Sequence, residues 1–291
     1  MINPISIFHL FVSFTLFTFN IYNPYFGLFL GLISPLFLIF YFDISKSNFK
    51  IELIVALLIY GYLFKIIALY YILFVLLPVI FIVKGKEKAE FTAGLPSLIV
   101  TIIIILFLPN IRDMFISTMI SNINSYLEIL KSSAPVEKLF YIEKISKNVN
   151  QIAKIFVYLM PSLSYGYIVF ITYINKRFYL RLKKQTVKPF TVPFKFIPIL
   201  VIGGFLILSK SFYTKMISYN TLIIFFVLFF LQGIEVLEYW LKKMKIPLIL
   251  KYLVYFFVIL EPPLTVIVSI FGLFDVWIDF RKLNKVGGEN G

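Results

Sequence analysis

Continuous apolar runs of bilayer length recur throughout this chain, and no other feature constrains its fold as strongly. In the N-terminal part these runs cover residues 5–19, 25–42, 51–83 and 93–108. A membrane-spanning helix needs about 17–25 residues, whereas a spanning β-strand alternates apolar and polar side chains. Only helices and closed barrels satisfy the backbone in lipid. Because the runs do not alternate, the sequence predicts an all-α, polytopic transmembrane helical bundle.

The number of spans depends on two runs that are too long for a single crossing. The C-terminal part adds apolar runs at residues 155–174, 196–208, 217–235 and 248–280. As single helices, 51–83 and 248–280 would each be about 50 Å long, against a hydrocarbon core of about 30 Å. For 51–83 we predict two short helices that turn near Lys65. For 248–280, Glu261-Pro262-Pro263 leaves a kinked helix or a re-entrant hairpin, and we favour the kinked helix, which gives about eight or nine spans.

The longest polar section, residues 110–154, has its own helical pattern. Its apolar residues recur at helical spacing in two stretches, which are Ile116, Ile120, Ile123, Leu127, Leu130 and Leu139, Ile142, Ile145, Val149, Ile152. The stretch Ser132–Pro135 between them is a stop and restart signal. We predict two amphipathic surface helices over 109–154, flanked by a five-span half at 1–108 and C-terminal spans at 155–291, all within one membrane domain, 1–291.

Lysine and arginine concentrate in four links between the apolar runs. Of the 28 basic residues, 16 lie in residues 43–50, 84–94, 176–195 and 239–251. Cytoplasmic links carry an excess of such residues, so these links and the N-terminus are expected in the cytoplasm. In a soluble protein the formal charge of +14 would suggest nucleic acid. Here the cations are expected to face anionic lipid, and no nucleic-acid partner is predicted.

The chain lacks the residue patterns that catalytic and metal sites need. It has no cysteine, and its single histidine, His9, has no carboxylate nearby in the sequence. The sequence contains neither a Gly-rich phosphate loop nor a Ser-His-Asp arrangement. We therefore predict no enzymatic activity, no cofactor and no metal site, and we interpret His9 as a helix–helix hydrogen-bonding group.

Four polar side chains stand out within the apolar C-terminal runs. They are Gln232, Glu235, Glu238 and Glu261. Carboxylates inside a membrane are costly and generally face a cavity or a partner. Gln232 and Glu235 share one helical face, and with Glu261 they form our candidate substrate-binding cluster. Glu238 precedes Lys242 by four residues, which is typical of an ion pair at the interface.

A pair of glycines in the second apolar run indicates a helix contact. Gly27 and Gly31 have the small-xxx-small spacing that lets two helices approach closely. We interpret this pair as a helix-packing face, which a neighbouring helix or a second copy of the chain could use.

The most distinctive string lies between Gly272 and Lys282. It contains a candidate interfacial signature, formed by Asp275, Trp277, Asp279 and Arg281. Trp277, with basic residues beyond it, is typical of an anchor at the membrane interface. Asp275 and Asp279 share a helical face and need a compensating cation, for which Lys282 is suitably spaced.

Four elements in this third of the chain together resemble the C-terminal signature of a known family. They are Phe230–Gly233, Leu241–Lys243 followed by Pro247, the pair Pro262-Pro263, and Leu273–Arg281. The family is the YybS-like family, bacterial predicted membrane proteins of unknown function, and the resemblance covers roughly residues 190–285. Where this chain has Glu238, the family often has a histidine. The family is more distantly similar to the substrate-binding (S) components of energy-coupling-factor transporters.

The resemblance implies a bacterial cytoplasmic (inner) membrane protein and gives two functional hypotheses. The first is a transport component that binds a small solute and has no ATPase of its own. The second is a non-transporting scaffold that recruits other membrane proteins. The expected partners are therefore the lipid bilayer, a small-molecule solute, and other membrane proteins or a second copy.

Overall fold

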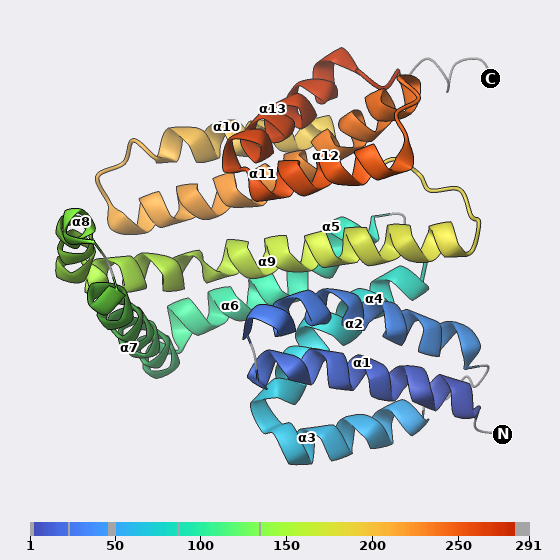
Figure 1. The fold of residues 1–291 in the computed structure, drawn as a ribbon, viewed down its shortest axis with the longest axis horizontal. Helices are drawn as coiled ribbons and strands as arrows, with labels where there is room; N and C mark the ends of the chain where they lie inside the picture. Colours follow the sequence, from blue (N-terminus) through green and yellow to red (C-terminus); the bar gives the residue numbers. More distant parts are fainter. Residues whose placement is uncertain (1–2, 23, 46–50, 86–87, 134, 283–291) are drawn as a thin grey trace. The chain divides into compact units, whose positions relative to one another are not determined.

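The computed structural model describes residues 3–22, 24–45, 51–85, 88–133 and 135–282 (Figure 1). Within these ranges the chain is helical and contains no β-strand, which confirms the all-α prediction. The N-terminal helices are α1 (Pro4–Tyr22), α2 (Pro24–Ile44), α3 (Ile51–Tyr71), α4 (Leu77–Val83), α5 (Ala89–Ala93) and α6 (Leu95–Phe107). The later helices are α7 (Pro109–Ser133), α8 (Val136–Lys147), α9 (Val149–Leu182), α10 (Ile197–Leu206), α11 (Phe212–Lys243), α12 (Leu248–Leu260) and α13 (Pro262–Ile278).

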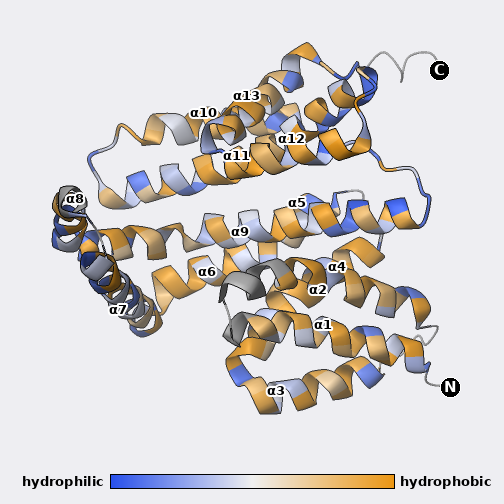
Figure 2. Cartoon of the chain, viewed as in Figure 1, coloured by the Kyte–Doolittle hydropathy of each residue, from blue (hydrophilic) through white to orange (hydrophobic). Residues whose placement is uncertain are grey.

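By length and composition alone, four helical segments among the described residues could cross a membrane, and the first of them contains a break. They are Ile51–Val83, Ala89–Phe107, Val149–Leu182 and Phe212–Lys243, and apolar residues follow them along most of their length (Figure 2). The bent pair α12 and α13 adds a fifth if it is one broken span. The described apolar parts of α1, α2 and α10 are shorter, so the predicted eight or nine spans are not confirmed.

The first overlong run turns at Lys65, as the sequence predicts. Lys65 has φ 30° and ψ −98°, which breaks the helix within α3. The rings of Tyr60 and Tyr71 lie 5.7 Å apart, although 11 residues of straight helix would separate them by roughly 16 Å. The chain therefore folds back on itself at Lys65, and a π-helical turn (Ile72–Leu76) connects the returning arm to α4.

The second overlong run breaks at Glu261, between α12 and α13. The two helices are bent by 104° relative to each other. Pro262 and Pro263 have no backbone N–H, so they fit the first turn of α13 and cannot continue α12. The predicted break is confirmed, and its angle is larger than that of an ordinary proline kink. The side of the membrane on which the tail lies stays a prediction.

The chain divides into two compact units, which are described separately. The first comprises Met1–Pro96, Gly166–Ile197 and Phe225–Gly291, and the second comprises Ser97–Tyr165 and Pro198–Ile224. The predicted three-section division of a single membrane domain stays a prediction.

In the first unit, α1 to α4 pack around hydroxyl groups that bond to one another. The Tyr71 hydroxyl, fully buried, lies 2.8 Å from Ser13 Oγ, which lies 3.1 Å from Ser34 Oγ. Thr18 Oγ1 lies 2.7 Å from the Tyr60 hydroxyl. These helices therefore hold together through neutral hydrogen bonds as well as apolar packing.

In the second unit, the predicted apolar stripes of α7 and α8 pack against each other. Leu127 of α7, Ile142 of α8 and Val149 at the start of α9 are buried together, with partly buried residues around them, which are Ile120, Ile123, Leu130 and Leu139. The second predicted helix is shorter than expected, because α8 ends at Lys147 and residues 149–154 belong to α9. α7 ends at Ser133 and α8 begins at Val136, so the predicted stop and restart is confirmed. The location of these two helices on a membrane surface stays a prediction.

Candidate functional site

The site begins with an unusually close crossing of α11 and α13 at two glycines. A Cβ added to Gly233 would collide with the backbone carbonyl of Val268. A Cβ added to Gly272 would collide with the backbone of Phe229 and Gly233. No side chain fits between the two backbones, so both positions require glycine. The close approach brings Gln232 on α11 next to Asp275 on α13.

Asp275 is held by a buried arginine that follows α13. Arg281 donates to Asp275 Oδ2 through Nε (3.0 Å) and Nη2 (2.6 Å), and both side chains are almost fully buried. Gln232 Nε2 donates to the same oxygen at 2.9 Å. Asp279 ends α13 in a left-handed conformation (φ 50°), which reverses the chain and allows Arg281 to reach back to Asp275.

The same side chains hold the extended segment 185–193, which we call the strap. Arg281 Nη1 donates to the Phe190 carbonyl at 2.9 Å, and the Val192 N–H donates to Gln232 Oε1 at 2.7 Å. The Phe190 ring stacks on Phe91 with centroids 4.8 Å apart. The strap has no secondary structure to satisfy its backbone, so side chains of α11 and the segment after α13 supply part of its hydrogen bonding.

Next to this cluster, two carboxylates on α11 meet two arginines on α9. Glu235 accepts a hydrogen bond from the Tyr173 hydroxyl at 2.6 Å and forms an ion pair with Arg177. Glu238 pairs with Arg181 at 2.8 Å and with Arg177 at 3.7 Å. Both carboxylates are buried. Because buried charges require partners, this network fixes α9 and α11 in register.

A polar cavity of about 370 Å³ lies among these residues. It is lined by Arg177, Arg181, Val187, Pro189, Glu235, Glu238, Tyr239, Lys242 and Arg281. Four of these side chains are cationic and two are carboxylates, so the lining carries more positive than negative charge. Arg181 and Lys242 have the most exposed side chains of the ionic network, at 51% and 65%. The volume is within the range of about 300–1,000 Å³ that is typical of small-molecule sites.

The structure brings together two of the three residues of the candidate substrate-binding cluster. Gln232 and Glu235 are both buried in the ionic network. Glu261 is exposed at the break between α12 and α13 and does not line the polar cavity. It lies 14 residues before Asp275, which corresponds to roughly 21 Å along a helix. Its place in the cluster is taken by Asp275, which the sequence assigned to the interface.

The residues of the interfacial signature lie in different environments. Trp277 is 51% exposed and its ring contacts Phe194, and its role as an interfacial anchor stays a prediction. Arg281 is only 5% exposed and points back into the protein, because the left-handed residue Asp279 reverses the chain. The cation that pairs with Asp275 is therefore Arg281.

Neither Gly31 nor His9 lines the polar cavity. Gly31 is buried in α2, whereas the side-chain surroundings of Gly27 lie outside the described residues. The Nδ1 atom of His9 lies 2.7 Å from the Ile5 carbonyl, so this hydrogen bond is within α1 and not between helices as predicted. Within the described ranges no group of three His, Cys, Asp or Glu side chains could hold a metal ion.

Sequence reasoning missed the basic half of the site. Arg177 and Arg181 belong to the cation-rich link that charge bias assigns to the cytoplasmic side, and this assignment predicts no individual role for either residue. A signal was present, because Tyr173, Arg177 and Arg181 recur every four residues and so share one face of α9. That face is the one that meets Glu235 and Glu238.

Comparisons with known proteins identify the family. The model for a family described as "Predicted membrane protein (DUF2232)" matches residues 11–276, which is most of the chain. The protein therefore belongs to this membrane protein family, in agreement with the resemblance found in its C-terminal third. Neither the curated proteins nor the solved structures contain a match.

Proposed function

We propose that this DUF2232 membrane protein binds a small carboxylate or phosphate anion in its polar cavity and serves as the solute-binding component of a transport system. It has no enzymatic activity and no ATPase of its own in this proposal. The observation that carries it is the convergence of six charged side chains around one cavity in a chain of which 60% is hydrophobic. Buried charges cost desolvation energy that apolar side chains avoid, so a cavity lined by six charged side chains supports a role in binding.

The charges of the lining indicate the class of solute. Two carboxylates offset two of the four cations, which leaves an excess of positive charge. Arg177 and Arg281 are buried and form ion pairs with buried carboxylates. The side chains of Arg181 and Lys242 are half exposed or more. A carboxylate or phosphate group entering the cavity would meet these two side chains and form charge-assisted hydrogen bonds with them.

Anion binding to the purified protein tests the proposal. In detergent micelles, citrate or inorganic phosphate should raise the midpoint of thermal unfolding, and choline should not. A ligand present at 100 times its Kd stabilises the folded state by about 2.7 kcal/mol. Lys242→Gln and Arg181→Gln should each weaken binding by about tenfold, because each removes one hydrogen bond from a charged donor.

The control variant is Lys251→Gln, which removes a lysine from α12 that does not line the cavity. It should bind the anion as the unmodified protein does. The proposal is wrong if neither anion changes the unfolding midpoint, or if Lys251→Gln loses as much affinity as Lys242→Gln.

A scaffold role is the second candidate, and one observation favours it. On α7 and α8, outside the candidate spans, Tyr126, Phe140 and Tyr141 are between 57% and 69% exposed. Exposed aromatic side chains of this kind are enriched where proteins bind each other. A photoreactive residue at Phe140, activated in native membranes, should give a reproducible protein adduct if the chain is a scaffold. Adducts with lipid alone would argue against it.

A further inference from the structure

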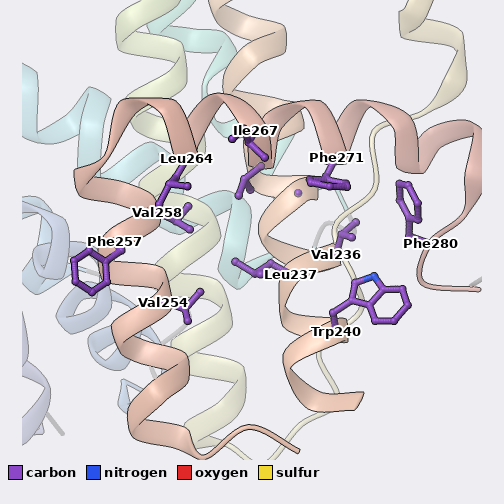
Figure 3. A pocket seen from close by; sticks show the side chains of 12 residues that line it. Val236, Leu237, Trp240, Val254, Phe257, Val258, Leu264, Ile267, Phe271 and Phe280 are labelled. Carbon is purple, nitrogen blue, oxygen red and sulfur yellow. The ribbon is translucent and has the colours of Figure 1, made fainter. Parts of the chain in front are cut away.

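A second cavity, of about 740 Å³, lies between α11, α12 and α13. Figure 3 shows side chains of α12 on one side, of α11 on the other, and of α13 crossing above both. All twelve lining residues are apolar or aromatic, or glycine. Val258 and Val268 are almost fully buried at its inner wall, whereas Phe257 and Phe271 at its edge are about half exposed.

This apolar cavity is separate from the polar cavity. The two lie on opposite faces of α11, because Gly233, Val236, Leu237 and Trp240 line one of them whereas Glu235, Glu238, Tyr239 and Lys242 line the other. No charged side chain lines the apolar cavity. A polar solute would lose its hydration there without gaining hydrogen bonds, so the occupant must be largely hydrocarbon.

The dimensions of the cavity fit a lipid acyl chain. Its α13 wall begins at Leu264 and continues to Phe280, just past the end of the helix. From Leu264 to Ile278 the helix rises roughly 21 Å. One leaflet contributes about half of the hydrocarbon thickness of roughly 30 Å, so an acyl chain of one leaflet can lie along this wall.

One end of the cavity carries the groups that proteins place at the lipid headgroups. Trp240 lies next to Phe280 at this end (Figure 3), and the Lys243 Nζ lies 4.6 Å from the centroid of the Trp240 ring. Lys242 and Lys245 flank Lys243 in the sequence. Tryptophan with lysine is typical of the membrane interface, and a lysine there attracts anionic headgroups.

We infer that the apolar cavity is a binding site for an anionic phospholipid, with one acyl chain between α11, α12 and α13 and its phosphate beside Lys243. The apolar lining favours the acyl chain, and Lys243 favours an anionic headgroup over a neutral one. This site goes beyond the proposed solute site and does not depend on it, since no residue lines both cavities.

Native mass spectrometry of the full-length protein tests the inference. The protein is purified in detergent and mixed with dioleoyl phosphatidylglycerol or dioleoyl phosphatidylcholine. One phosphatidylglycerol should remain bound after detergent removal in the gas phase, in preference to phosphatidylcholine. Ile267→Trp should lower this binding by about tenfold, because the indole takes the space of several buried methylene groups.

The matched control is Ile270→Trp. Ile267 and Ile270 lie on the same helix and are 47% and 46% exposed, but only Ile267 lines the cavity. Ile270→Trp should bind phosphatidylglycerol normally. Lys243→Gln should keep the acyl chain site and lose about fivefold in preference for phosphatidylglycerol over phosphatidylcholine.

Three results would overturn the inference. The first is the absence of a one-to-one lipid adduct in the unmodified protein. The second is an equal loss of lipid in Ile267→Trp and Ile270→Trp. The third is a dimer that Ile267→Trp alone dissociates, which would make a second copy of the chain the occupant. Thermal unfolding of each variant in detergent confirms that it is folded.

Discussion

The N-terminal helices α1 to α4 and the C-terminal helices α11 to α13 both bury polar side chains, but of different kinds. In the N-terminal helices the buried groups are hydroxyls, and Tyr71, Ser13 and Ser34 bond to one another without any charge. In the C-terminal helices they include ions beside the neutral Gln232 and Ser269, and Asp275 with Arg281 is the most deeply buried ion pair. The N-terminal helices show that neutral hydrogen bonds can connect apolar helices. The need to connect helices therefore does not explain why the C-terminal helices bury ion pairs.

The difference indicates where stability and function are each concentrated. A buried ion pair costs desolvation energy that an apolar pair of the same size avoids. In the proposed function, the ion pairs serve the polar cavity beside them and not net stability. Four substitutions test this contrast between the neutral and the ionic region.

Arg281→Met should be the most destabilising of the four. It leaves Asp275 as a buried charge without its cation, which costs about 3–5 kcal/mol in the free energy of unfolding. Titration with sodium dodecyl sulfate, followed by circular dichroism, measures this loss. The double variant Asp275→Leu/Arg281→Met should lose less than the single one, because no charge is left unpaired.

The control for this substitution is Arg112→Met. Arg112 pairs with Asp113 at 2.8 Å, but the two side chains are 25% and 62% exposed. A pair of this kind contributes about 0–1 kcal/mol. If Arg112→Met and Arg281→Met lower the free energy of unfolding by the same amount, the buried ion pair contributes no more to stability than the exposed one.

Gly233→Ala should be the next most destabilising substitution. The added methyl group meets the backbone of α13, which cannot rotate away, so the two helices must separate at a cost of about 3 kcal/mol. Gly61→Ala in α3 is its N-terminal counterpart, because its Cβ would lie 3.9 Å from Ala68 Cβ, an ordinary contact. Gly61→Ala should be neutral or stabilising by up to about 1 kcal/mol, since alanine favours helix. Equal losses in the same titration would contradict the assignment of close packing to α11 and α13.

Tyr71→Phe should have a smaller effect, of about 1 kcal/mol. It removes one neutral hydrogen bond, and Ser13 Oγ keeps its bonds to Ser34. Tyr62→Phe, at a position that is 85% exposed, is expected to cause no loss. If Tyr71→Phe lowers the free energy of unfolding by more than about 3 kcal/mol, the neutral hydrogen bonds contribute as much to stability as the buried ion pair.

Lys242→Gln should change stability least, by less than about 0.5 kcal/mol, because the Lys242 side chain is 65% exposed and Glu238 keeps its pairs with Arg181 and Arg177. Its expected effect is on anion affinity instead. A variant that unfolds as the unmodified protein does and yet binds citrate or phosphate more weakly would separate function from stability at the entrance of the polar cavity.

Features set by neighbouring residues could be predicted from the sequence. The apolar runs indicate the helices, the overlong run 51–83 requires a turn, and Lys65 provides it. The prolines after Glu261 define the break before α13. The stripes of α7 and α8 follow from their spacing, and the two stripes pack together.

Features set by distant residues could not be predicted in the same way. The pairs of Arg181 with Glu238 and of Tyr173 with Glu235 join positions 57 and 62 residues apart. Charge bias alone accounts for a basic link, so it gives no reason to look for individual partners. The reach of Arg281 back to Asp275 depends on one left-handed residue, Asp279, a conformation that a helical pattern does not reveal.

The hydrogen bond from Arg281 to the Phe190 carbonyl has a consequence for the time at which the site can form. The two residues are 91 positions apart. At a translation rate of about 5–20 residues per second, Phe190 is made roughly 5–18 s before its partner. Asp275, in contrast, is followed by its cation within six residues. The acid and its cation are therefore made close together, whereas the strap can complete this hydrogen bond only after Arg281 has been made.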